Sequence, residues 1–253
     1  YYLTEAIRKD HALSMSGECS DEIFGGYPWF YEKKRKLTTF PWIRNLDYKE
    51  SLLNEKCRSI LKLKEYVMKE FDMAIKEAPT LSTDSKTTIR DRQLTYINIK
   101  YFMTNLLDRK DRISMESSLE VRVPFCDKDL VDFLYNVPFK YKYKNKTEKK
   151  LLRDAYKGTV IDEVIERKKS PYPKSNSKEY HEEVVKLLRE VLEDKSSVLY
   201  EIFDINKIED ILNSEEELEV PWYGQLMRKT AFLAYLYQID YWFKTYKIKL
   251  EIE

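Results

Sequence analysis

The stretch SGECSDEIFGGY, residues 16–27, directly follows a short apolar-leaning run, HALSM, at residues 11–15. A run of this length before a glycine is typical of a buried parallel β-strand, which predicts a strand-to-helix loop over residues 16–26. Open α/β sheets bind ligands at the carboxyl ends of their strands. Three of the chain's five glycines lie in the stretch, so its most permissive backbone is concentrated there. We therefore expect the chemistry of the protein at this place.

Three carboxylates, Glu18, Asp21 and Glu22, lie close together in this stretch. Their mutual repulsion is costly unless cations or backbone N–H groups meet them, and Mg²⁺ takes one or two carboxylates together with phosphate oxygens. The same residues also fit a helix start, in which Ser20 is the N-cap and the acidic side chains stabilise the helix N-terminus. The residues alone leave both interpretations open, and both can hold at once.

The composition excludes several classes of protein. The 253 residues contain 45 basic and 44 acidic side chains, so no excess of positive charge indicates a nucleic-acid partner. No apolar run reaches the length of a membrane span, and the first residues do not resemble a signal peptide, so no membrane is expected. The cytoplasm is the expected location. Five glycines indicate few tight turns and favour a helical protein.

The cysteines and histidines indicate neither a disulfide framework nor a metal centre. Cys19, Cys57 and Cys126 are odd in number, far apart in sequence and without CxxC spacing, which predicts no disulfide framework and no zinc site. His11 and His181 cannot supply a histidine-rich metal site.

The remainder of the chain has the charged, amphipathic pattern of helices. We expect helices over residues 48–78, 85–107, 128–135, 147–157 and 221–245. Thr83 or Asp84 is the candidate N-cap of the second of these helices, Asp127 of the third and Thr147 of the fourth.

Three segments, in the same order, resemble the asparagine synthetase family. The stretch at residues 16–27 resembles the family's SGExxDExFGGY segment. LEVRVPFCD at residues 119–127, preceded by DRKDR at 108–112, looks like its LExRVPFxD segment. The basic run RKK at residues 167–169, which alone is typical of a solvated face, matches the position of a family lysine that contacts phosphates. By its place in the run this lysine is Lys169, with the neighbouring Lys168 as the alternative. The resemblance covers nearly all of the chain and is weakest over residues 33–82 and after Tyr180.

The resemblance implies a mainly α fold. The chain would be the helical C-terminal part of an adenine-nucleotide α-hydrolase-like (ATP-pyrophosphatase) α/β domain. Residues 1–30 would be a remnant of the sheet with the SGExxDE loop, and residues 31–253 the helical part. A free-standing α/β domain needs more strands than this, so we expect the N-terminal half of the parent protein to be missing from this chain.

The implied activity is that of asparagine synthase (glutamine-hydrolysing), a carbon–nitrogen ligase. In this family aspartate attacks ATP, in the presence of Mg²⁺, to give a β-aspartyl-adenylate and pyrophosphate. Ammonia, released from glutamine by an N-terminal glutaminase domain, then displaces AMP and leaves asparagine. The implied cofactors are thus ATP and Mg²⁺, and the implied partners are aspartate, ATP and ammonia.

The family's roles carry over onto matching residues of the first and third segments. Glu18 would accept a proton from the attacking ammonia. Asp21 would be the magnesium ligand, and Lys169 would stabilise charge on the phosphates as a point donor. Ser16 and Gly17 would lie beside the nucleotide, which a glycine allows to approach closely. Relatives that close β-lactam rings carry tyrosine at the position of Glu18, so glutamate favours external ammonia.

The second segment matches the substrate side of the family's cleft, which implies that Glu120 and Arg122 face the substrate. By themselves they are more typical of a structural ion pair. The family's SGGxDS pyrophosphate loop and its N-terminal nucleophilic cysteine are absent from this sequence, which predicts that the chain alone is inactive. Two alternatives stay open: a related amidotransferase acting on another carboxylate, in an antibiotic, cell-surface sugar or peptide, and a non-catalytic helical interaction module. A homodimer also stays open.

Overall fold

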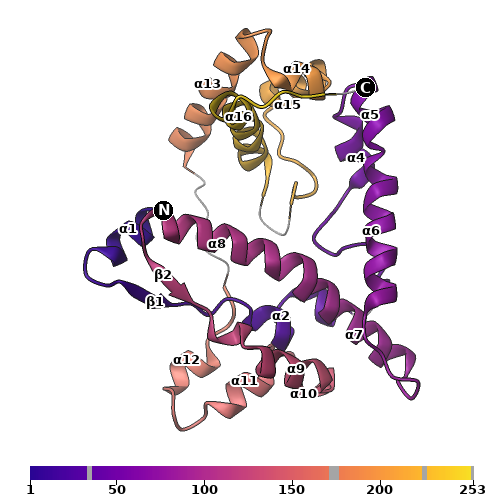
Figure 1. Cartoon of the computed structure of the whole chain (residues 1–253), viewed down its shortest axis with the longest axis vertical. Helices are drawn as coiled ribbons and strands as arrows, with labels where there is room; N and C mark the ends of the chain where they lie inside the picture. The colour runs from indigo at the N-terminus through magenta and orange to yellow at the C-terminus, as the bar shows by residue number, and fades with distance from the viewer. Residues whose placement is uncertain (33–35, 171–176, 224–226, 252–253) are drawn as a thin grey trace. The chain divides into compact units, whose positions relative to one another are not determined.

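The computed structural model describes residues 1–32, 36–170, 177–223 and 227–251. The chain forms two compact units, the first of Tyr1–Thr38 and Asp72–Lys169 and the second of Thr39–Phe71 and Ser170–Glu253. Helices dominate both units (Figure 1). Helix α6 (Leu63–Glu77) runs from the second unit into the first. These units are defined by the packing inside this chain. The predicted division at residue 30 separates a remnant of a larger sheet from the helical part, so the two units do not test it and it stays a prediction.

The first unit contains the two strands of the described chain and most of its short helices. Its elements are α1 (Tyr2–Arg8), β1 (Leu13–Met15), α2 (Ser20–Phe24), α3 (Pro28–Tyr31), α7 (Lys86–Ile97), the π-helix η1 (Asn98–Met103), α8 (Thr104–Glu116), β2 (Glu120–Arg122), the 3₁₀-helix η2 (Pro124–Cys126), α9 (Lys128–Asn136), α10 (Phe139–Lys142), α11 (Lys150–Ala155) and α12 (Asp162–Glu166).

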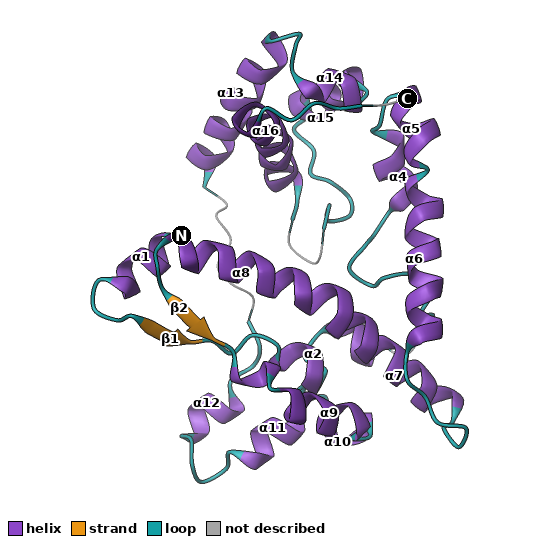
Figure 2. Ribbon diagram, in the orientation of Figure 1, coloured by secondary structure: helices purple, strands orange, loops and turns teal. Residues whose placement is uncertain are grey.

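Strands β1 and β2 pair in parallel, as the two adjacent arrows of Figure 2 show. Ser14 is opposite Val121 in the register, and the ladder continues past β1, where the Ser16 amide donates to the Arg122 carbonyl at 2.9 Å. The predicted strand is therefore present. Its predicted burial is wrong, because Leu13 is 37% and Met15 69% exposed. Parallel strands are buried only where layers cover both faces of the sheet, and the described residues provide no such cover for these two side chains.

Helix boundaries differ from the expected ones where a cap competes with the amphipathic pattern. The span predicted as one helix over residues 48–78 is divided into α4 (Leu46–Ser51), α5 (Glu55–Leu61) and α6. The Asn54 side chain accepts from the Cys57 amide at 2.8 Å and begins a new helix. The helix predicted over residues 85–107 continues through η1 to the end of α8.

The predicted caps have mixed outcomes. Asp127 caps α9 as predicted, since its side chain accepts from two backbone amides at 3.0 Å. The cap of α7 is Ser85, whereas Asp84 accepts from the Leu81 amide in the preceding turn, so the prediction of Thr83 or Asp84 is wrong. The cap of α11 is a left-handed residue two positions after the predicted Thr147. The last long helix begins eight residues later than predicted, at Lys229 rather than at residue 221.

A small apolar cluster fixes α2 in the first unit. Ile23, Phe24 and Leu134 are at most 5% exposed and form the cluster with flanking side chains of α9 and η2. The Phe24 and Phe125 rings meet edge to face, with centroids 6.0 Å apart. Because α2 directly follows the loop at residues 16–19, this cluster also determines where that loop lies.

The described part of the second unit is built from helices and has a larger core. It contains α4, α5, α13 (Lys178–Glu193), α14 (Val198–Ile202), α15 (Ile205–Asn213) and α16 (Lys229–Tyr246), with the first part of α6. Leu188, Ile208, Phe232, Leu233 and Leu236 are fully buried, and α13 packs along α16. None of the helices formed by the described residues is long and apolar enough to cross a membrane.

Candidate functional site

The loop between β1 and α2 is held by its own polar groups. The Glu18 amide donates to Ser16 Oγ at 3.3 Å, and Ser20 Oγ donates to the Gly17 carbonyl at 2.8 Å. Ser20 is the first residue of α2 rather than its predicted N-cap. That position belongs to Cys19, which has a left-handed backbone (φ 74°) and makes no capping bond through its side chain. The tight turn places the carboxylates on either side of Cys19 at the start of a short helix.

Asp21 lies between two lysines from distant parts of the first unit. Its Oδ1 is 2.9 Å from Lys149 Nζ and 3.0 Å from Lys169 Nζ. Lys149 Nζ also donates to Ser20 Oγ at 2.9 Å, and Lys169 Nζ donates to the Gly26 carbonyl at 3.1 Å. A Cβ atom at Gly26 would lie 1.7 Å from Asp21 Oδ1, so only glycine permits this arrangement. Two cations around one carboxylate leave a local excess of positive charge, which suits phosphate oxygens.

A second network positions the two lysines. Arg153 on α11 donates from Nε to the Glu148 carbonyl at 2.9 Å and from Nη1 to the Arg167 carbonyl at 2.9 Å. The Glu148 carboxylate in turn pairs with Arg153 Nη2 at 2.8 Å and accepts from the Lys169 amide at 3.3 Å. Glu148 and Arg153 thus join the segment that precedes Lys149 to the segment that ends in Lys169.

Tyr27 provides an aromatic surface beneath one of these lysines. Lys169 Nζ is 4.4 Å from the centroid of the Tyr27 ring, which stacks on Trp29 at 4.6 Å. The Tyr27 hydroxyl donates to Glu22 Oε1 at 2.7 Å. Glu22 is only 1% exposed, and this burial raises its pKa while the Tyr27 hydrogen bond opposes the rise. Burial and the neighbouring Glu22 also raise the pKa of Tyr27. Glu22 therefore orients Tyr27.

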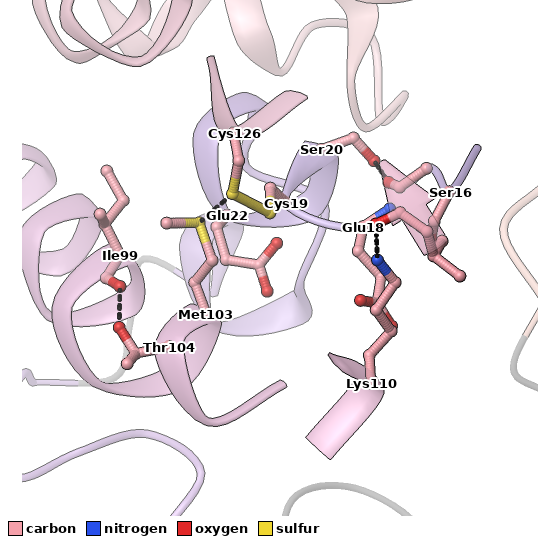
Figure 3. The surroundings of a disulfide bond; sticks show 12 residues. Ser16, Glu18, Cys19, Ser20, Glu22, Ile99, Met103, Thr104, Lys110 and Cys126 are labelled. Atoms are coloured by element: carbon pink, nitrogen blue, oxygen red, sulfur yellow. Dashed lines mark hydrogen bonds between the residues drawn. A yellow bond between two sulfur atoms is a disulfide. The ribbon is translucent and has the colours of Figure 1, made fainter. Parts of the chain in front are cut away.

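Glu18 is the least satisfied carboxylate of the site. Its Oε2 is buried and has no hydrogen-bond donor among the described residues, and its Oε1 is 3.9 Å from Arg109 Nη2. Burial raises the pKa of Glu18, and the positive charges of Arg109 and Lys110 partly oppose the rise. Lys110 lies on the same side of the loop (Figure 3) and donates to the Val121 carbonyl at 2.6 Å. Burial lowers the pKa of Lys110. A desolvated carboxylate of this kind can accept a proton.

Two predicted site residues are not brought to the lysine cluster. Glu120 Oε1 and Arg122 Nε pair with each other at 2.8 Å on the exposed surface of β2. Only the Arg122 backbone touches the loop, through its hydrogen bond with the Ser16 amide. Their placement beside a substrate stays a prediction.

The expectation of no disulfide is wrong. Cys19 and Cys126 form one across 107 residues of sequence, with their Cα atoms 5.8 Å apart (Figure 3). The parallel pairing of β1 with β2 brings together the segments that follow the two strands, which linear spacing cannot reveal. Cys57 is free and buried in the second unit.

Asp21 is the one residue of this chain that the sequence predicts as a magnesium ligand. The described residues contain no group of three or more histidine, cysteine or acidic side chains that could hold a metal ion. Magnesium is often bound through one or two carboxylates and substrate phosphates, so Asp21 alone fits an ion that arrives with a nucleotide.

Sequence reasoning identified Asp21 and Lys169, which the structure brings together, but missed Lys149. Lys149 lies in the basic run KNKTEKK at residues 144–150, where charge pattern alone does not distinguish one lysine from its neighbours. What distinguishes Lys149 is its contact with Asp21 and its place at the N-cap of α11, and both exist only in the folded chain.

Comparisons with known proteins show which family the chain resembles. A family model described as asparagine synthase matches residues 1–244. The chain is 43% identical to asparagine synthetase [glutamine-hydrolyzing] 3 of Bacillus subtilis (strain 168) over 97% of its own length and 40% of that relative. It is 30% identical to asparagine synthetase [glutamine-hydrolyzing] 1 of the same organism, over 68% of this chain and 32% of the relative. The chain thus spans well under half the length of these relatives. Its largely helical fold, with a short parallel sheet, is that of the C-terminal part of an adenine-nucleotide α-hydrolase-like domain. The chain belongs to the asparagine synthase family.

Proposed function

We propose that this chain supplies the adenylating and amide-forming site of a ligase that makes asparagine from aspartate, ATP and ammonia. The observation that carries the proposal is the pair of ammonium groups, Lys149 and Lys169, within 3.0 Å of Asp21 Oδ1 beside a strand-end loop. In adenylation, the α-phosphorus of ATP is attacked and pyrophosphate leaves. The developing negative charge then needs preorganised cations.

Each described side chain has a part in this reaction. Lys149 and Lys169 exchange part of their contact with Asp21 for phosphate oxygens and stabilise the leaving pyrophosphate. Asp21 would hold a magnesium ion that arrives with ATP and supplies further charge neutralisation there. The Tyr27 ring and the Gly26 carbonyl keep Lys169 in place during this exchange.

The second half-reaction needs a base. When ammonia attacks the carbonyl carbon of the acyl-adenylate and AMP leaves, the new nitrogen must lose a proton. Glu18 accepts it, because its Oε2 has no competing donor among the described residues and burial raises the pKa of its carboxyl group. A glutaminase domain of the whole protein would deliver the ammonia. We place the reaction in the cytoplasm, where ATP is abundant, and a homodimer is compatible with it.

Pyrophosphate release tests this proposal. The full-length gene product is incubated with ATP, magnesium and ammonium across a panel of carboxylic acids, and products are separated by chromatography. Aspartate is expected to drive equal amounts of pyrophosphate and asparagine. If another acid drives release while aspartate does not, the substrate is a different carboxylate and the asparagine assignment fails. If no acid drives release, the adenylation chemistry itself is wrong.

A further inference from the structure

The disulfide between Cys19 and Cys126 lies inside the proposed site. Cys19 is the residue between Glu18 and Ser20. Cys126 is the last residue of η2, the short helix that follows β2. Their Cα separation of 5.8 Å is usual for a disulfide. The bond therefore ties the loop that carries Glu18 to the neighbouring parallel strand segment.

The loop depends on few other restraints. Cys19 has a left-handed backbone, which is unfavourable for a residue with a side chain, and its side chain makes no capping hydrogen bond. Between the ladder bond of Ser16 and the start of α2, the contacts of the loop with the described residues are few: the bonds of Ser16 Oγ and the Gly17 carbonyl, the 3.9 Å pair of Glu18 with Arg109, and the Cys19 carbonyl bonded by the Ile23 amide. A covalent link at Cys19 consequently has a large effect on how far Glu18 can move.

The surrounding fold has other contacts besides this bond. The β1–β2 ladder, the Phe24–Phe125 ring contact and the buried Ile23–Leu134 cluster hold the same two segments together without it. The disulfide can therefore open while the first unit stays folded.

The two sulfur atoms differ in access. Cys19 is 2% exposed, whereas Cys126 is partly exposed and has Met103 Sδ 3.8 Å from its sulfur. Thiol–disulfide exchange requires a thiolate to reach a sulfur along the S–S axis, so access decides which sulfur reacts. Attack from solvent is expected at Cys126 and not at Cys19.

We propose that Cys19 and Cys126 are a reversible thiol–disulfide exchange site that sets the mobility of the Glu18 loop, with low-molecular-weight thiols and disulfides of the glutathione class as the exchanging partners. On reduction, a glutathione thiolate bonds to Cys126 Sγ and Cys19 leaves as a thiolate, which takes up a proton. A second glutathione thiolate displaces Cys126, releasing oxidised glutathione. The reverse sequence converts two protein thiols and one oxidised glutathione into the protein disulfide and two reduced glutathiones. Any consequence for catalysis rests on the proposed function, because Glu18 and Asp21 flank the site.

Single-cysteine variants of the full-length gene product test which sulfur exchanges. In C19S, oxidised glutathione is expected to add to Cys126. In C126S, addition at Cys19 should be slower by about tenfold or more, because that sulfur is buried. Peptide mass spectrometry measures both adducts over time. Equal rates, or faster addition at Cys19, would contradict the exchange route. C57S, which leaves both cysteines of the pair intact, is the control and should form the Cys19–Cys126 linked peptide normally.

Hydrogen exchange then measures the loop itself. Amides of residues 16–20 should exchange several-fold more slowly in the oxidised than in the reduced wild-type protein, whereas those of α13 should not differ. In C19S this redox difference should vanish. Identical loop exchange in the two redox states would overturn the proposal, as would the absence of a linked peptide after oxidation. These readouts need no ligase activity, so failure of the proposed function and failure of this inference can be told apart.

Discussion

The two units of the chain each contain a cluster of carboxylates and lysines. The clusters differ in how many of their carboxylate oxygens have a hydrogen-bond or ion-pair partner. In the second unit, Asp240 is 3% exposed, accepts from Ser197 Oγ at 2.6 Å and pairs with Lys244 Nζ at 3.0 Å, so each of its two oxygens has a partner. In the first unit, Glu18 Oε2 is buried without a donor among the described residues, and Asp21 is shared between two lysines.

The difference in hydrogen-bond partners distinguishes a carboxylate that stabilises the fold from one that is available for chemistry. A buried polar group with all its partners stabilises the fold, whereas one left unpaired costs about 1–3 kcal/mol. A folded protein retains such a cost where another requirement favours it, and the proton acceptance that we propose for Glu18 is such a requirement. The cluster around Asp240, which has its partners, requires no ligand to explain it.

Replacement of Asp21, the carboxylate that two lysines contact, has the largest expected effect on activity. Asp21→Asn removes the negative charge that both lysines contact, together with the proposed magnesium ligand. We expect aspartate-dependent pyrophosphate release by the full-length protein to fall about 10³-fold. Asp194→Asn, in which the lost carboxylate paired with exposed Lys244, is the matched control and should stay near wild type. Comparable losses in both variants would remove the distinction between the clusters.

Glu18→Gln tests the unpaired oxygen. The amide keeps the shape of the side chain but cannot accept a proton, so asparagine formation from ammonium should fall about 10²-fold. ATP–pyrophosphate exchange driven by aspartate should stay within a few-fold of wild type, because adenylation does not need this base. A loss of exchange equal to the loss of asparagine formation would place Glu18 in the first half-reaction instead.

Neighbouring lysines offer a test of the residue that sequence reasoning missed. Lys149→Ala removes one of the two contacts of Asp21 and should reduce pyrophosphate release about 10²-fold. Lys150, the next residue, pairs with Asp154 away from the site, so Lys150→Ala should retain most activity. Steady-state rates at saturating ATP measure both. Similar rates for the two variants would show that Lys149 has only a structural role.

Substitutions in the second unit should change the stability of the protein and leave its catalytic rate unchanged. Ser197→Ala removes the donor to Asp240 Oδ1 and the cap of α14, which should lower the free energy of unfolding by about 2 kcal/mol in urea titrations. Ser196→Ala, at an exposed neighbour that bonds Asp194, should cost clearly less. The turnover number of each folded variant should equal that of wild type, and a selective loss of turnover in Ser197→Ala would contradict the division.

Glu22 gives the smallest effect, which depends on pH. Its pKa in the folded protein is raised by burial above the unfolded value, so the folded state binds the proton more tightly. Stability of the wild type therefore falls as pH rises from the unfolded pKa through the raised folded pKa. Glu22→Gln lacks this titration and keeps an acceptor for the Tyr27 hydroxyl. Its melting temperature relative to wild type should increase with pH across this window, and a constant difference would exclude the mechanism.

Much of the site was predictable because its residues are close in sequence. The order of acidic residues and glycines in residues 16–27 identified the loop, and the segment resemblance added Lys169. Lys149 could not be found this way, since its neighbours Lys146 and Lys150 have the same charge and only the turn before α11 directs it at Asp21. The exposure of Leu13 and Met15 was likewise unpredictable, because burial depends on which layers cover a sheet.

The sequence by itself determined the helical character, the strand and the polar loop that follows it, the cap at Asp127 and the family resemblance, since these depend on local patterns. Only the tertiary structure decided that Cys19 meets Cys126 and that Lys149 joins Lys169 on Asp21. The physical reason is that parallel pairing of β1 with β2, and the packing of α2 against α9, bring together residues more than 100 positions apart. Such proximity leaves no periodic signal in the chain.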